Sequence, residues 1–200
     1  MISIYKIKPK FQKLLMPLLK LFKKLGISPN TITFSSILLS FLLSYFLWNA
    51  FENSLYFLFV AFGLLFRMML NALDGMMARI YNLQSKKGEV LNEVGDIISD
   101  TAIYFPLILF ESIEIELAII FIVFSIINEF CGLLAKVVSG NRRYDGPMGK
   151  SDRAFLIGLI CIIYYFTNKI DPYMNTVIFV ASILMIISSY LRLTKSITNE

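Results

Sequence analysis

The chain has 200 residues, of which 57% are hydrophobic and only 16% are charged, and its mean hydropathy is +0.70. Globular proteins are roughly 45–50% apolar and about 25% charged, so the composition excludes an ordinary soluble domain and indicates an integral membrane protein. The sequence contains no histidine, which excludes Ser-His-Asp and Cys-His catalysis and histidine-ligated zinc. Its two cysteines, Cys131 and Cys161, lie in apolar runs and are expected to be small buried side chains, neither a disulfide nor a metal site.

The first expected element is an amphipathic helix between Lys6 and Leu25, within an interfacial segment 1–28. Lysines are set beside a regular apolar face, which is typical of a helix lying in the membrane interface against anionic lipid. A solvated basic tail is the alternative, but the regular face disfavours it. Pro17 is expected to bend the helix and Gly26 to end it. The apolar face consists of Phe11, Leu14, Leu15, Leu18, Leu19 and Phe22.

Six apolar segments follow, and together with the N-terminal helix they are expected to form one membrane domain over residues 1–200. Most of them approach the roughly 20 residues that a helix needs to cross the hydrocarbon core. No alternating strand pattern suggests a barrel, so the fold class predicted is an all-α bundle of six transmembrane helices. The second and third segments carry acidic residues and the fifth is short, so their hydropathy is weaker. The segments are about 32–49, 54–78, 90–110, 117–138, 154–168 and 173–191.

The basic residues predict the topology. All but two of the 19 Lys and Arg residues, Arg67 and Lys169, lie in the segments that an even number of crossings places on one side. Loops rich in Lys and Arg stay in the cytoplasm. We therefore expect a multi-pass protein of the cell (inner) membrane with both termini and the functional site facing the cytoplasm. No cleaved signal peptide is expected, because the first long apolar run begins after residue 30.

Polar residues inside two neighbouring segments predict a functional site, since ionisable groups are costly in lipid. Asn71 and Asp74 are three residues apart on one helix face, and Asn92, Asp96 and Asp100 follow one another at intervals of four on the next. The short connection 80–87 makes the two helices antiparallel neighbours, so the two stripes converge. Oxygen ligands of this kind suit Mg²⁺ or Mn²⁺.

Small residues lie among these polar positions, at Gly75, Ala78, Gly88 and Gly95. They allow a helix or a ligand to approach the backbone closely. Hydrogen bonds between helices alone would explain one asparagine, but not carboxylates, amides and glycines in one register. The pattern therefore favours a metal site for a phosphate-bearing molecule.

These residues resemble the signature of the CDP-alcohol phosphotransferase family, D-x-x-D-G-x-x-A-R, eight residues, then G-x-x-x-D-x-x-x-D. Residues 71–79 read N-A-L-D-G-M-M-A-R, and after eight residues 88–96 read G-E-V-L-N-E-V-G-D. The resemblance covers the first half of the chain closely. The second half is similar in layout and in the sequence G-K-S-D-R at 149–153.

The resemblance implies an enzyme that transfers a phosphatidyl group from CDP-diacylglycerol to an alcohol and releases CMP, with a divalent metal. Asp96 would be the general base on the acceptor hydroxyl or a metal ligand, with Asn71, Asp74 and Asn92 as further ligands. The cytidine-diphosphate pocket would be shaped by Gly75, Ala78, Arg79 and Gly88. Family habit, together with small residues at Ser36, Ser40 and Ser44 that allow close contacts within or between chains, suggests a homodimer.

Two departures from the family pattern matter. Asn71 and Asn92 stand where the family has aspartate, so we hypothesise that one metal site is weakened or lost and that Asp100, or less favourably Glu93, compensates. A degenerate relative that only binds nucleotide or lipid, or acts as a scaffold, is the alternative. Arg67 is expected either to pair with Glu129 or to contact substrate.

The acceptor side is predicted from four cations between the fourth and fifth segments, Arg142, Arg143, Lys150 and Arg153. The fork of an arginine matches phosphate, so a phosphorylated acceptor such as glycerol phosphate or inositol phosphate is favoured. A neutral polyol or an amino alcohol is the alternative, and the cations would then be topology determinants. Because the charges border membrane segments, lipid headgroups rather than nucleic acid are the expected partners.

A transporter would also place carboxylates inside the membrane, but it would usually show internal repeats, and none is found in the sequence.

Overall fold

The computed structural model describes residues 8–167 and 169–198, with side chains from residue 11 onward, and this part is entirely helical. The expected all-α class is therefore confirmed. The helices in chain order are α1 (Lys8–Lys24), α2 (Pro29–Trp48), α3 (Leu55–Ile80), α4 (Lys86–Tyr104), the 3-10 helix η2 (Phe105–Leu109), α5 (Ile115–Ser139), α6 (Lys150–Phe166), the 3-10 helix η3 (Asp171–Tyr173) and α7 (Met174–Ile197).

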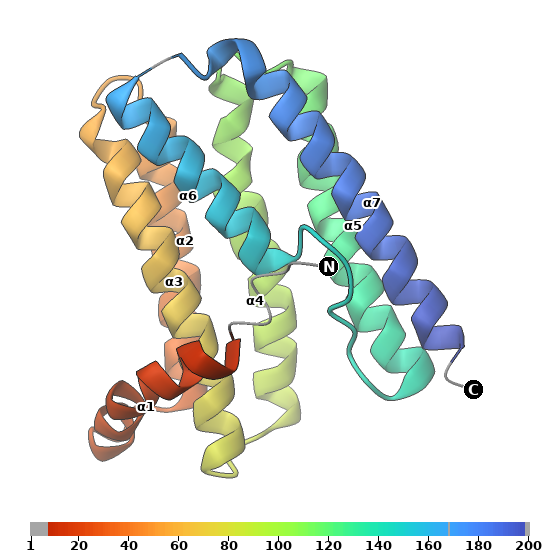
Figure 1. Ribbon diagram of the computed structural model, residues 1–200. Coiled ribbons are helices and arrows are strands. Elements are labelled where there is room, and N and C mark those ends of the chain that lie inside the picture. Colours follow the sequence, from red (N-terminus) through yellow and green to blue (C-terminus); the bar gives the residue numbers. More distant parts are fainter. Residues whose placement is uncertain (1–7, 168, 199–200) are drawn as a thin grey trace.

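The N-terminal helix α1 lies across one end of the bundle, beside α3 (Figure 1). Lys6 and Ile7, where the expected amphipathic helix begins, lie outside the described residues. The helix continues through Pro17 and is followed by Gly26, whose φ of +73° belongs to the left-handed region that glycine adopts without steric cost. Only part of the apolar face reaches the bundle: Leu15 and Leu19 are buried, whereas Leu14 is 74% exposed.

The remaining helices form two groups (Figure 1). Helix α2 packs against α3 and α4, and α3 packs against α6, whereas α5 pairs with α7. Helix α4 also contacts α5 and so links the two groups. Ser28 begins α2 by accepting a hydrogen bond from the Thr31 amide at 3.1 Å, with Pro29 in the first turn, as the N-cap rule leads one to expect.

Four stretches are long and apolar enough to cross a membrane: α2, α3, α5 and Asp171–Ile197. The two other expected crossings do not qualify. Helix α4 is too charged, and α6 has 17 residues; Asn168, the last residue of the expected fifth segment, lies outside the described part. The expected third segment, 90–110, becomes α4 followed by η2, which has Pro106 near its start. Six crossings are thus not confirmed, because α4 carries the polar residues of the site described next.

A large apolar core fills the end of the bundle away from α1. Phe51, Phe57, Phe110 and Tyr164 meet there with ring centroids 4.8–6.3 Å apart. Both cysteines are free and buried, as expected. Buried charged side chains appear only nearer the α1 end among the described residues, so the two ends of the bundle have different roles.

Candidate active site

A cavity of about 820 Å³ opens at the α1 end and is lined by residues from every α-helix. Helix α1 contributes Phe11 and Gln12, and α2 contributes Asn30 and Thr33. The cavity brings together most of the residues that the sequence singles out. Those that line it are Asn71, Asp74, Gly75, Ala78, Arg79, Gly88, Asn92, Asp96, Arg142 and Lys150.

The polar faces of α3 and α4 meet as expected. The Asp74 carboxylate accepts hydrogen bonds from the Thr33 hydroxyl at 2.9 Å and from the Asn92 amide nitrogen at 3.1 Å. The Asn71 amide oxygen accepts one from the Ser36 hydroxyl at 2.7 Å. These bonds fix the side chains before any ligand arrives, which lowers the cost of assembling the site on binding.

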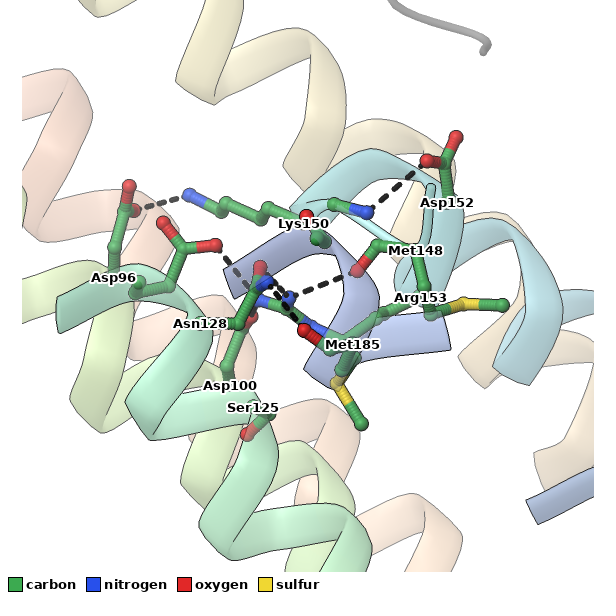
Figure 2. Close-up of polar contacts among 12 residues, drawn as sticks. Asp96, Asp100, Ser125, Asn128, Met148, Lys150, Asp152, Arg153 and Met185 are labelled. Carbon is green, nitrogen blue, oxygen red and sulfur yellow. Dashed lines mark hydrogen bonds and ion pairs between the residues drawn. The ribbon is translucent and has the colours of Figure 1, made fainter. Parts of the chain in front are cut away.

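Asp96 lies one turn further along α4 and is ion-paired with Lys150 from the first turn of α6. Figure 2 shows the Lys150 side chain reaching across toward Asp96. The pair thus positions the Asp96 side chain at the cavity wall.

A buried ion-pair cluster, which we define as Arg67, Asp100, Arg153 and Glu129, extends from the cavity wall into the bundle, because Arg67 and Glu129 line the cavity and the other two members lie behind it. Asp100 is 2.8 Å from Arg67 and 2.8 Å from Arg153, and Arg153 also bonds Glu129 at 3.0 Å. The Arg153 side chain is fully buried and also donates to the Met148 carbonyl and the Asn128 amide oxygen, as Figure 2 shows. The cluster joins α3, α4, α5 and α6 through ion pairs.

Arg142 extends this network into the cavity. One of its terminal nitrogens donates to Glu93 and the other to Glu129, at 2.7 Å for the latter. Burial acts to lower the pKa of Arg142, but Tyr144, Glu129 and Glu93 outweigh it and raise the pKa above the ordinary value for arginine. The guanidinium therefore stays charged with both ends of its fork occupied.

The loop that carries Arg142, residues 140–149, is fastened to α5 and α7. A Cβ on Gly132 would lie 2.8 Å from the Arg143 carbonyl oxygen, and a Cβ on Gly146 would lie 2.6 Å from the Ser188 Cα. Gly146 also has a φ of +93°. Arg192 bonds the Asp145 carbonyl from α7. Only glycine permits these close approaches of the loop to α5 and α7. Together with the Arg192 hydrogen bond, the close packing holds the loop against these two helices.

Three predicted site residues lie elsewhere. Asp100 and Arg153 do not line the cavity, because they neutralise each other within the buried ion-pair cluster. Arg143 points away and donates to the Lys195 carbonyl at 3.1 Å. The expectation that Asp100 replaces a lost metal ligand therefore has no support in this placement, and neither has phosphate binding by Arg143 or Arg153.

Two other expectations need correction. Arg67 pairs with Asp100 rather than Glu129, because Glu129 is taken by Arg153 and Arg142. The small serines of α2 make contacts inside the chain: Ser36 bonds Asn71, and Ser44 donates to the Ala102 carbonyl at 2.7 Å. They therefore give no support to a homodimer, which stays a prediction from family habit.

Sequence reasoning missed Thr33 and Arg192 as parts of the site. Thr33 belongs to the turn that starts α2, and its bond to Asp74 depends on how α2 packs on α3. Arg192 looked like a topology determinant near the chain end. A signal did exist for Arg192: it directly follows the last expected apolar segment, 173–191, where an unpaired cation facing the bundle would be costly.

The cavity offers oxygen ligands that fit a divalent cation. Among residues 8–167 and 169–198, no three Asp, Glu or Cys side chains gather as a metal site, because amides occupy two of the positions. Asp74 and Asp96 nevertheless line one cavity with the amide oxygens of Asn71 and Asn92. Carboxylate and amide oxygens are ligands for Mg²⁺ and Mn²⁺, and two carboxylates suit one cation better than two.

The sequence and the fold were then compared with known proteins. The family model described as CDP-alcohol phosphatidyltransferase matches residues 26–193. The inner membrane protein YnbA of Escherichia coli (strain K12) is 45% identical over 157 residues, which are 78% of each chain. An uncharacterized protein of Aquifex aeolicus (strain VF5) is 38% identical over 96 residues, covering 48% of this chain and 46% of that protein.

Solved structures share the fold. The phosphatidylinositol phosphate synthase PgsA1 of Mycobacterium tuberculosis with CDP-DAG bound superposes with a TM-score of 0.70 at 19% identity, covering 92% of this chain and 94% of that one. The same enzyme in complex with manganese and citrate gives a TM-score of 0.71 at 20% identity, covering 91% and 88%.

Proposed function

Because the chain belongs to the CDP-alcohol phosphatidyltransferase family of membrane enzymes, we propose that it transfers a phosphatidyl group from CDP-diacylglycerol to the hydroxyl of an alcohol and releases CMP. One observation carries the proposal: Asn71, Asp74, Asn92 and Asp96, which occupy the acidic positions of the family signature, all line a single cavity. The PgsA1 structure with bound CDP-DAG has the same fold, which supports the choice of donor.

The proposed donor site lies at the α3–α4 end of the cavity. Arg79 is exposed, lines the cavity and has no carboxylate partner among the described residues. A Cβ on Gly75 would lie 3.2 Å from the Arg79 guanidinium, so glycine leaves the space in which this cation can swing onto a diphosphate. Arginine provides two parallel donors for phosphate oxygens.

Asp96 is proposed as the general base that accepts the proton of the acceptor hydroxyl. Its ion-pair partner Lys150 comes from the other side of the cavity, next to the loop 140–149. A bound Mg²⁺ or Mn²⁺, held by Asp74, Asp96 and the amide oxygens of Asn71 and Asn92, would neutralise the diphosphate and stabilise the departing CMP. Thr33 and Asn92 keep the Asp74 carboxylate turned into the cavity.

We also propose that all six long helices after α1 cross the membrane, with both termini and the cavity on the cytoplasmic side. The α3–α4 turn, the loop 140–149 and the carboxyl end of α7 lie at the α1 end of the bundle (Figure 1). Residues 1–28, these segments and the adjoining helix ends together contain 17 of the 19 Lys and Arg residues, in agreement with the positive-inside rule. The charges of α4 are paired with cations of neighbouring helices, which lowers the cost of placing that helix in lipid.

The test is CMP release from CDP-diacylglycerol by the purified protein in detergent with Mg²⁺ or Mn²⁺ and a panel of alcohols. Asp74→Ala and Asp96→Ala are expected to abolish release. Asp145→Ala is the matched control, because Asp145 pairs with Lys195 outside the cavity, and it should retain activity. Full activity in either cavity variant would refute the assignment.

A non-catalytic, nucleotide-binding relative is the second candidate, favoured by the loss of two family aspartates at Asn71 and Asn92. The same assay separates the two functions. Binding of CDP-diacylglycerol without CMP release, and without exchange of labelled CMP into the donor, would support the binding role.

A further inference from the structure

The cations of the cavity fall into two groups with different partners. Arg79 and Lys86, at the α3–α4 turn, have no ion pair among the described residues. At the opposite end, beside the loop 140–149 and α6, each cation that lines the cavity has a carboxylate within 4.0 Å. These paired cations are Arg67, Arg142, Lys150 and Arg192. Lys136, which also lines the cavity, is paired with Glu89.

The pairing leaves little capacity for a further anion. Both terminal nitrogens of Arg142 are already donating, to Glu93 and Glu129. Lys150 is engaged with Asp96. Arg192 donates to backbone carbonyls of Asn128 and Asp145. Glu93 and Glu129 themselves line the cavity, so this end presents carboxylate oxygens as well as nitrogens.

We propose that the acceptor alcohol of this enzyme carries no phosphate group, being a neutral polyol or an amino alcohol. The inference deepens the proposed function and rests on it. A phosphate entering this end would be repelled by Glu93 and Glu129, or would have to displace Glu93 from Arg142 and leave that half-buried carboxylate without its ion-pair partner, which is unfavourable. A hydroxyl or an ammonium group meets no such penalty, and carboxylates on the wall exclude the charged analogue by repulsion.

The experiment compares matched acceptor pairs with the purified protein, CDP-diacylglycerol and Mg²⁺. The pairs are glycerol with glycerol 3-phosphate, inositol with inositol phosphate, and ethanolamine with phosphoethanolamine. CMP release gives kcat/KM for each compound, and inhibition of CMP release to the best acceptor of the panel gives the apparent affinity of the others. We expect the unphosphorylated member of the best pair to be favoured by about tenfold or more, the effect of one unfavourable charge contact at a partly buried site.

Each result decides a different point. If a phosphorylated member is used faster than its partner, the inference is wrong and the transferase function stands. When neither member of a pair is consumed but another alcohol is, equal or stronger inhibition by the phosphorylated member also overturns it, and stronger inhibition by the unphosphorylated member supports it. Absence of CMP release with every acceptor overturns the proposed function itself.

A pair of variants tests the cause of the selectivity. Glu93→Gln removes one carboxylate from Arg142 and is expected to shift the kcat/KM ratio toward the phosphorylated acceptor by about tenfold. Glu89→Gln is the matched control, because Glu89 also joins α4 to α5, through Lys136, but both side chains of that pair are 39–48% exposed. It should leave the ratio unchanged. An identical ratio in the two variants would contradict the role of Glu93.

Discussion

Replacing Asp100 by asparagine is the sharpest test of the buried ion-pair cluster. Asp100 is 3% exposed and lies 2.8 Å from both Arg67 and Arg153. Asparagine has nearly the same shape but no charge, so Asp100→Asn leaves Arg67 without a carboxylate and Arg153 with Glu129 alone. Removing one partner of a buried ion pair costs about 3–5 kcal/mol.

That loss corresponds to a large thermal shift. For chains of about 150–250 residues, 1 kcal/mol changes Tm by roughly 2–4 °C, so Asp100→Asn is expected to lower Tm by about 10 °C. Arg67→Met removes the cation that Asp100→Asn leaves unpaired. The double variant should therefore be more stable than the sum of the two single losses predicts, by about 1 kcal/mol or more.

The measurement is thermal unfolding in one detergent, followed by circular dichroism, for the parent, both single variants and the double variant. A loss below about 1 kcal/mol for Asp100→Asn, or additivity within about 0.5 kcal/mol, would refute the argument. Mn²⁺ titration of the same samples gives an independent check. Asp100→Asn should bind Mn²⁺ like the parent, because Asp100 does not line the cavity, and a weakened affinity would restore Asp100 as a ligand.

Three further predictions follow from the cavity and its loop. Chelation by EDTA should abolish CMP release, and added Mg²⁺ or Mn²⁺ should restore it; release that persists after exhaustive chelation would exclude the metal role. Converting Asn71 and Asn92 to aspartate should tighten Mn²⁺ binding and raise the number of ions bound per chain, measured by titration, and unchanged stoichiometry would show that charge is not what limits the second ion. Gly146→Ala should lower stability by about 2 kcal/mol or more in thermal unfolding, because its Cβ would meet Ser188 at 2.6 Å. Gly140→Ala, at a φ of +76° but in open space, should cost only about 1 kcal/mol, and equal losses would show that the close contact is unimportant.

The helical class, the approximate helix bounds and the meeting of α3 with α4 were predictable from local pattern. The intervals of three and four residues put Asn71, Asp74, Asn92 and Asp96 on facing surfaces whatever the rest of the chain does. The same spacing predicts that the signature glycines and Arg79 lie beside these polar residues. All of these positions belong to one helical hairpin with a short turn, so residues close together in the sequence determine them.

The partners of the charged residues were not predictable, because they depend on how distant helices pack. Glu129 and Asp100 are both buried acids, and nothing local decides which of them faces Arg67. Nor does sequence spacing show that Arg153 points behind the cavity while Lys150, three residues earlier, points into it. The same dependence on packing decides what surrounds the expected phosphate site, which stays a prediction: its cations could be identified from the sequence, but their carboxylate partners come from α4 and α5.

The charge pattern of α4 has a consequence for biosynthesis. Glu89, Glu93, Asp96 and Asp100 give this helix four acids in three turns, and one aspartate at the centre of a helix costs about 2.5–3.5 kcal/mol during insertion by the translocon. Of the cations that pair with α4, only Arg67 is synthesised before it; Lys136, Arg142, Lys150 and Arg153 follow. In the proposed six-crossing topology, we therefore expect α4 to settle fully into the membrane only after α6 has emerged from the ribosome. A nascent chain halted before residue 150 would lack Lys150 and Arg153 and would expose an incompletely neutralised helix to membrane proteases.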